Sequence, residues 1–233
     1  MFFNNGNLQK LIAIIGFVLL VGCATKAPVG ETDPTLDAQR LQVQKEQEQF
    51  TYALGLVQTE NPTEDDLLEA KAILDFLYQS NSAYLGALIN SADISLKLER
   101  LDEAKALYLE AIQKVELAKG SVNTSQTVPE NNTMFSVHIY NQLGLIERQQ
   151  GQFDQAESYY RQALVLDSDN PATLKNLAIL LDLYRGKLAE ALVLYERYQS
   201  IVNDVDSDSA DPRIKDWIYD LKNRLPLEEV GNE

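Results

Sequence analysis

The stretch YNQLGLIERQQGQFDQAESYYRQALVLDSDNP, residues 140–171, sets the pattern for most of the chain. Its apolar residues recur every three or four positions on both sides of Gly151, which is the period of an amphipathic α-helix. Small Gly144 and Ala156 allow two such helices to approach closely, and Gly151 makes the turn between them. Tyr160 is placed to fill the space between the helices. The stretch therefore predicts a helical hairpin.

Alanines at the corresponding position mark further units along the chain. Ala191 lies 35 residues after Ala156, and Ala104 lies 34 residues after Ala70. The spacing from Ala104 to Ala156 is 52 residues, so we predict an inserted loop at about 119–132, where the sequence is polar and rich in turn formers. This segment can be interpreted either as a functional loop or as a tolerated surface insertion.

The unit that follows Pro171 departs from the pattern at two points. Its one extra residue falls near Tyr184 and Arg185, before the turn, so we predict a slightly lengthened first helix. Tyr198 stands where the preceding unit has Ala163, and a side chain of that size must pack differently onto the next segment of the chain.

These units resemble the tetratricopeptide repeat (TPR), whose pattern is an aromatic residue, Leu-Gly, a glycine turn, an alanine, an aromatic residue, an alanine and a proline. Over residues 37–200 the resemblance implies an all-α, TPR-like helical-hairpin solenoid, a right-handed superhelix of about four repeats of which the first is degenerate. Residues 201–233 are predicted to form an acidic linker, a capping helix and a tail. Asp211 is the expected N-cap of that helix and Pro212 its first residue.

An uninterrupted apolar run of 12 residues, Leu11–Gly22, precedes the single cysteine. This length is typical of a signal peptide and too short to span a bilayer as a helix. The sequence Leu20-Val21-Gly22-Cys23 resembles the bacterial lipobox, which implies cleavage between Gly22 and Cys23 and lipidation of Cys23. Residues 1–22 are therefore predicted to be a lipoprotein signal peptide, and residues 23–36 an acylated cysteine with a flexible tether. The alternative is a signal anchor with an incidental cysteine.

Ala24 follows the cysteine. In proteobacterial lipoproteins an aspartate at this position tends to retain the protein in the inner membrane, so the rule implies the outer membrane here, for a Gram-negative host. We expect a lipid-anchored protein on the periplasmic face, with palmitate among its acyl chains, because two or more chains anchor a protein stably.

Charge and composition exclude several classes of function. A formal net charge of −15 argues against nucleic acid and against docking of a basic face onto anionic lipid. Cys23 and His138 are the only cysteine and histidine, too few for a Cys/His metal site, and lipidation removes Cys23 from a catalytic pair with His138. Asp204–Asp208 resembles the start of a calcium loop, but Ser209 and Lys215 stand where a glycine and a glutamate are needed. We expect no enzyme activity, catalytic residue, metal or cofactor.

In a stack of helical hairpins the first helix of each pair lines the concave face. Positions of those helices that packing does not require form the candidate peptide-binding groove. These positions are Ile89, Asp93, Leu96, Lys97, Asn141, Leu145, Arg148, Gln149, Lys175, Ile179 and Asp182. Their mixture of apolar and charged side chains suits an extended or helical peptide.

The sequence thus predicts a periplasm-facing lipoprotein scaffold or adaptor that binds another envelope protein, in the assembly of an envelope complex. TPR lipoproteins of this kind resemble pilus and secretin pilotins, adaptors for peptidoglycan enzymes and accessories of ExbB/TonB-type systems, and fold analogy does not choose among them. A cell-wall-acting enzyme is one alternative, although no nucleophile, base or metal cluster can be assembled. A small-ligand carrier is another, and Leu145 and Ile179 argue mildly against it. The partner and the oligomeric state stay open.

Overall fold

The computed structural model describes residues 34–81, 84–121, 130–205 and 211–225. Within these ranges it consists of α-helices and one short π-helix, without a β-strand, which confirms the all-α prediction. The chain divides into two compact units, residues 1–107 and 108–233, which are described separately. The predicted signal peptide, Cys23 and most of the tether lie outside the described residues.

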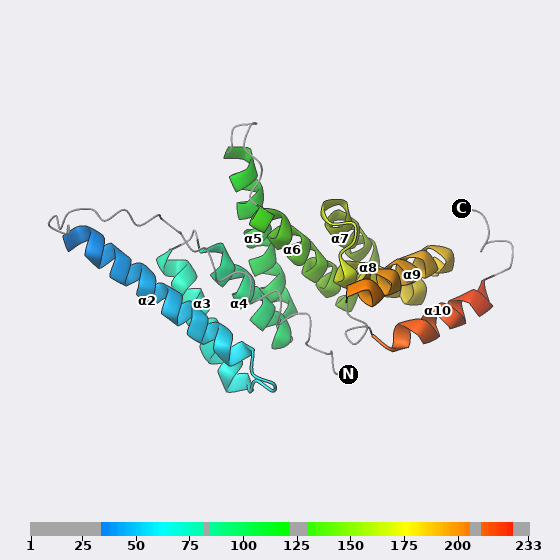
Figure 1. Cartoon of the computed structure of the whole chain (residues 1–233), viewed down its shortest axis with the longest axis horizontal. Helices are drawn as coiled ribbons and strands as arrows, with labels where there is room; N and C mark the ends of the chain where they lie inside the picture. The colour runs from blue at the N-terminus through cyan, green and yellow to red at the C-terminus, as the bar shows by residue number, and fades with distance from the viewer. Residues whose placement is uncertain (1–33, 82–83, 122–129, 206–210, 226–233) are drawn as a thin grey trace. The chain divides into compact units, whose positions relative to one another are not determined.

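Unit 1 contains α2 (Pro34–Val57), α3 (Glu64–Ser80), α4 (Leu85–Lys97) and the start of α5 (Leu101–Ser121). Helix α3 packs against α2 on one side and α4 on the other (Figure 1), and Leu74 and Leu77 at its centre are buried. Helix α2 begins three residues before the predicted start of the repeats.

The start of α3 follows from a capping box. The Thr63 hydroxyl accepts a hydrogen bond from the Asp66 backbone N–H at 3.1 Å, and the Asp66 carboxylate accepts one from the Thr63 backbone N–H at 2.8 Å. The Thr63 hydroxyl also donates to this carboxylate, and its hydrogen bonds hold the pKa of Asp66 below the usual range. The degenerate first repeat therefore has a well-defined second helix.

Unit 2 contains the rest of α5, α6 (Glu130–Gln149), α7 (Phe153–Leu166), α8 (Pro171–Leu180), the π-helix η1 (Leu181–Arg185), α9 (Leu188–Val205) and α10 (Arg213–Arg224). From α6 to α10 each helix packs against the next, as Figure 1 shows. Both ends of the predicted loop at 119–132 are helical, since α5 extends to Ser121 and α6 begins at Glu130, and residues 122–129 lie outside the described ranges.

The hairpin of α6 and α7 depends on a close approach at Gly144. A Cβ atom there would lie 2.6 Å from Cδ1 and Cε1 of Tyr160, whose side chain is fully buried. Gly151 has a φ of 76°, in the left-handed region that favours glycine, and it makes the turn between the two helices. Both glycines therefore have the roles that the sequence predicted.

The extra residue of the next unit appears as the π-helix η1. A π-bulge accommodates one inserted residue inside a helix, and η1 ends at Arg185, beside the position where the sequence placed the insertion. Gly186 follows with a φ of 65° and ends the helix. The sequence predicted a slightly longer first helix in this unit. The structure accommodates the extra residue in the wider π-helical turn η1, which directly follows α8.

Helix α10 covers the last hairpin. Ile214, Ile218 and Leu221 are buried in the core of unit 2, as expected for a capping helix. Tyr198 is buried, and its hydroxyl accepts a hydrogen bond from the Asp211 backbone N–H at 3.3 Å. The large residue at this repeat position thus holds the segment that leads into α10.

Candidate functional site

The candidate groove residues of unit 1 lie on α4. Ile89 is 2% exposed and belongs to the core, so its side chain offers almost no surface to a partner. Asp93, Leu96 and Lys97 are half-buried. Burial lowers the pKa of Lys97, and the charge of Asp93 opposes this effect, so these two groups are neighbours. The accessible part of this face is the C-terminal turn of α4.

The candidate groove residues of unit 2 lie on α6 and on α8 with η1. On α6, Asn141 is buried and its side-chain oxygen accepts a hydrogen bond from the Asn176 amide of α8 at 3.0 Å. Leu145 and Arg148 are half-buried and Gln149 is exposed. The structure therefore joins α6 and α8 through an amide pair. In the C-terminal half of α6 it leaves Gln149 exposed and Leu145 and Arg148 partly exposed.

Residues 211–224, which lead into and form α10, contact two of the three candidates on α8 and η1. Lys175 lies 3.6 Å from the Asp211 carboxylate, and its ammonium lies over the Tyr198 ring. Asp182 accepts a hydrogen bond from Arg224 at 3.2 Å, and its side chain is only 7% exposed.

Ile179 packs against the core to which α10 contributes. The cap therefore engages part of the face that the sequence assigned to a partner. Of the candidates in unit 2, Gln149 of α6 is exposed, while Lys175, Ile179 and Asp182 are half-buried like Leu145 and Arg148.

Two buried tyrosines, Tyr160 and Tyr195, lie near Arg148, and the sequence analysis gave Tyr160 a packing role alone. Burial raises the pKa of Tyr160, and the Arg148 charge opposes this rise. Burial also raises the pKa of Tyr195, the charge of Asp182 adds to it, and Arg148 again opposes it. Arg148 thus lies near both phenol groups. The sequence offered one signal for this proximity, since the hydroxyl of a tyrosine at a core position usually needs a polar neighbour.

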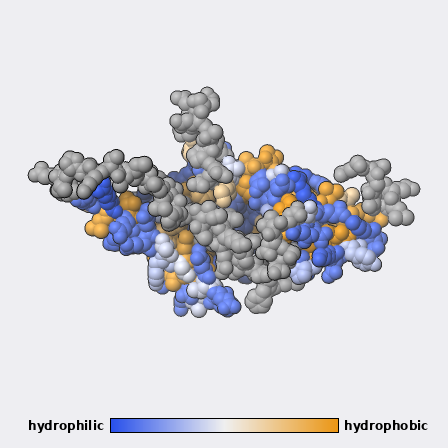
Figure 2. Space-filling view, viewed as in Figure 1, coloured by the Kyte–Doolittle hydropathy of each residue, from blue (hydrophilic) through white to orange (hydrophobic). Residues whose placement is uncertain are grey.

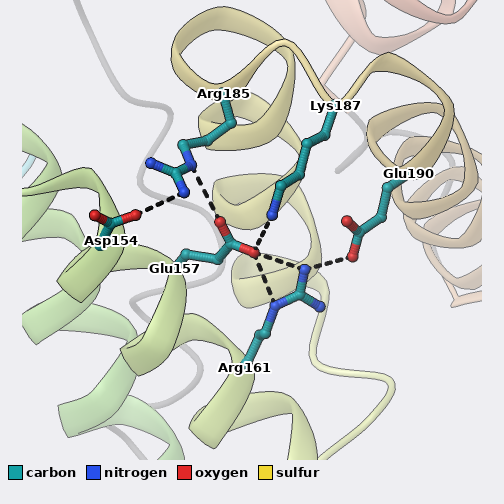
Figure 3. Close-up of polar contacts among 6 residues, drawn as sticks. All are labelled: Asp154, Glu157, Arg161, Arg185, Lys187 and Glu190. Carbon is teal, nitrogen blue, oxygen red and sulfur yellow. Dashed lines mark hydrogen bonds and ion pairs between the residues drawn. The ribbon is translucent and has the colours of Figure 1, made fainter.

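A separate cluster of charges surrounds Glu157 on α7 (Figure 3). Arg161 donates to its carboxylate at 2.8 Å, Lys187 at 2.7 Å, and Arg185 lies 3.3 Å from it. Asp154 and Glu190 bind the outer sides of Arg185 and Arg161, so three acidic and three basic groups compensate one another. The cluster ties α7 to η1 and to the start of α9, which is a structural role.

Other classes of site have little support among the residues described. No group of three or more His, Cys, Asp or Glu side chains there could hold a metal ion. None of the described helices is both long and apolar enough to cross a bilayer. The face seen in Figure 2 mixes hydrophilic and hydrophobic residues along the helices.

Two stretches of the chain match family models described as tetratricopeptide repeat, residues 85–113 and residues 135–204. The chain therefore contains tetratricopeptide repeats, as the sequence pattern indicated. The matches include α4 with the first part of α5, and α6 to α9, but not the degenerate first hairpin of α2 and α3. A comparison with curated proteins gave no significant match.

Solved structures share the fold at low sequence identity. The MamA RS-1 ArsTM double mutant is 16% identical over 88% of this chain and 100% of its own, with a TM-score of 0.52. The structure titled Functional Characterization of Pseudomonas Aeruginosa pilF is 15% identical over 85% of this chain and 86% of its own, also with a TM-score of 0.52. Proteins of this fold are typically non-enzymatic scaffolds that bind peptide or protein partners.

Proposed function

We propose that this chain of tetratricopeptide repeats is a lipid-anchored adaptor that holds another envelope protein against α6. One observation carries the proposal: repeats of a protein-binding type follow a lipobox-like sequence that ends at Cys23. The repeats supply a binding surface, and the lipid keeps that surface within reach of the membrane. The adaptor has no catalytic residues, and its task is the assembly of an envelope complex.

The accessible residues of α6 support this placement of the partner. Leu145 supplies apolar area, while Arg148 and Gln149 supply hydrogen-bond donors beside it. A mixture of this kind suits a peptide segment, because apolar anchors give affinity and polar groups fix orientation. The cap contacts α8, so we assign the partner surface in unit 2 to α6.

Crosslinking in intact cells, followed by purification of the lipoprotein, tests the adaptor role. Leu145→Asp should reduce recovery of the bound envelope protein at least tenfold, because a charge replaces the apolar anchor of the proposed surface. Val165→Asp is the matched control, since Val165 lies on α7 and is 85% exposed. The adaptor proposal fails if no envelope protein is recovered above background, and the placement fails if Leu145→Asp recovers as much as the parent chain.

Fractionation of cells tests the anchor and its location. The parent chain should sediment with outer membranes and need detergent for release, whereas Cys23→Ala should not be lipidated or cleaved at this site. Ala24→Asp should shift the protein to inner membranes, because aspartate after the cysteine acts as a retention signal in this class. Release of the parent chain by salt alone would contradict lipid anchoring, and an unchanged distribution of Ala24→Asp would contradict the sorting rule.

A further inference from the structure

Helix α2 has a long side that the rest of unit 1 leaves uncovered. Its core side carries Phe50, Leu54 and Val57, which are buried in the core of that unit. Residues 34–45 are all exposed, so the N-terminal half of the helix is held by few contacts. A helix of about 12 residues is only marginally stable alone in water. Because α2 is the outermost helix of unit 1 (Figure 1), its uncovered side is accessible to another molecule.

Four exposed residues form one stripe along this side, which we call the α2 stripe. They are Leu41, Lys45, Glu48 and Tyr52, spaced by four, three and four residues. Such spacings place side chains on one face of a helix and are those of a coiled-coil seam. Leu41 and Tyr52 are 68% and 54% exposed. The stripe is therefore apolar at both ends, with one positive and one negative charge between them.

The order of these residues makes the α2 stripe complementary to itself. An antiparallel pair of α2 helices with a two-fold axis between residues 46 and 47 places Leu41 against Tyr52 of a second copy. The same axis places Lys45 against Glu48 of the second copy, because both pairs have the same sum of residue numbers. Each contact occurs twice by symmetry. A parallel pair would instead place each charge against its own kind.

Helix α3 adds apolar surface beside the stripe. The Tyr52 hydroxyl donates a hydrogen bond to the Glu69 carboxylate of α3 at 3.0 Å, which directs the ring towards that helix. Phe76 follows Glu69 by seven residues, or two helical turns, so it lies on the same side of α3, and it is 58% exposed. The two helices form a hairpin and run in opposite directions, so Phe76 lies level with the middle of the stripe.

The charge of α2 favours a second copy of this chain as the occupant. The helix contains three acidic and two basic residues, whereas the whole chain has a net charge of −15. Repulsion between two copies is therefore weakest where α2 faces α2, and salt screens the remaining charges beyond about 8 Å. The chain before the helix offers little to cover the stripe, because residues 24–33 contain one aliphatic side chain larger than alanine, Val29.

We propose that the α2 stripe is a dimer interface, in which the α2 helices of two copies pack antiparallel about a two-fold axis. The inference goes beyond the proposed function and does not depend on it, since it uses α2 and not α6. The axis lies close to the midpoint of α2, so the two helices overlap along nearly their full length of about 36 Å. One helix from each copy makes a small interface, at or below about 1,200 Å² in total, so we expect reversible dimerisation in the micromolar range.

Sedimentation equilibrium of residues 23–233 with Cys23→Ala, a chain without lipid that contains every residue the structure describes, tests the dimer. The parent chain should change from monomer to dimer as its concentration rises through the micromolar range. Lys45→Glu and Glu48→Lys should each weaken dimerisation at least about fivefold, because each variant places two pairs of like charges in the interface. The double variant should dimerise like the parent chain, because exchange of the two charges restores both pairs. An equimolar mixture of the two single variants should form mixed dimers for the same reason.

An apolar position of the stripe has a matched control on the same helix. Leu41→Asp should abolish dimerisation at concentrations that dimerise the parent chain, because it places a carboxylate against the Tyr52 ring of the second copy. Val43→Asp should dimerise as the parent chain does. Val43 is 52% exposed but lies seven residues before Phe50, on the side of α2 that faces away from the stripe. Circular dichroism confirms that each variant remains helical.

Disulfide formation tests the antiparallel arrangement. With Cys23 replaced, a mixture of Leu41→Cys and Tyr52→Cys chains should form disulfide-linked mixed dimers on mild oxidation, and neither variant should do so alone. A disulfide formed by Leu41→Cys alone, or the absence of the mixed disulfide, would overturn the proposed interface. A parent chain that stays monomeric, or single charge variants that dimerise as well as the parent, would overturn it too. None of these results bears on recovery of an envelope partner through α6, so the adaptor role stands or falls separately.

Discussion

Gly144→Ala is expected to destabilise unit 2 by about 1–3 kcal/mol, because overpacking in a tight core typically costs this amount. The added methyl group would lie 2.6 Å from two ring carbons of Tyr160, well inside van der Waals contact. The ring has no space to move into, since Tyr160 is completely buried. Either α6 and α7 separate or the ring is displaced, and both disturb the core cluster to which Tyr160 belongs. Urea unfolding followed by the fluorescence of Trp217, the only tryptophan, measures the change.

Gly55→Ala is the matched control for this substitution. Gly55 lies inside α2, and a Cβ atom there would meet nothing within 4 Å. Alanine has the higher helix propensity, so Gly55→Ala should stabilise unit 1 by about 0.5–1 kcal/mol.

The cause of the Gly144 effect can be isolated with Tyr160→Leu, which removes the ring that the methyl group would meet. In a double-mutant cycle the two substitutions should be clearly less than additive. Additive effects, or a Gly144→Ala protein as stable as the parent, would show that the helices are not held together by this contact.

The spacing of small and aromatic residues, together with the resemblance to the tetratricopeptide repeat, predicted much of unit 2. The small residues Gly144 and Ala156 predicted a close approach of two helices, and the structure shows this approach between α6 and α7. The additional residue before Gly186 was detectable by counting, although the count did not reveal that the backbone would absorb it as a π-helix. The sequence also predicted the capping helix, and the structure begins it at Arg213, one residue after the predicted start at Pro212.

The relation of α10 to the groove could not be read from the sequence. Asp211 and Arg224 pair with Lys175 and Asp182, which lie 36 and 42 residues away in sequence, and such pairs depend on how the cap is placed in space. Ile89 was assigned to the groove because its position on the helix predicts the direction of its side chain. That position does not predict how deeply neighbouring helices bury the side chain, and Ile89 is 2% exposed. The repeat pattern predicted that Tyr160 packs in the core. It could not predict that the Tyr160 hydroxyl has no hydrogen-bond partner among the residues that the structure describes.

Glu157→Gln is expected to destabilise unit 2 by about 2 kcal/mol at neutral pH. The Glu157 side chain is 11% exposed and faces three cations, whereas those cations are 28–45% exposed. Loss of the central charge from a fully buried pair costs about 3–5 kcal/mol, and solvent around the cations reduces that figure. Glutamine keeps the size of the side chain and one acceptor, so the loss reports the charge. Glu190→Gln is the control, because Glu190 is 40% exposed and should cost less than about 1 kcal/mol.

The pH dependence of the Glu157→Gln effect distinguishes lost charge from altered packing. Burial alone would raise the pKa of Glu157, but hydrogen bonds from Lys187 and Arg161 outweigh it and hold the pKa below 4.5. The carboxylate therefore stabilises the folded chain fully above the pKa of the unfolded state, and this contribution is lost as the pH falls through the lower pKa of the folded state. Urea unfolding between pH 7 and pH 3 should show the parent chain approaching Glu157→Gln at the acidic end. A gap that stays constant across this range would mean that the glutamine disturbs packing, and that the charges around Glu157 contribute little to holding α7 against η1.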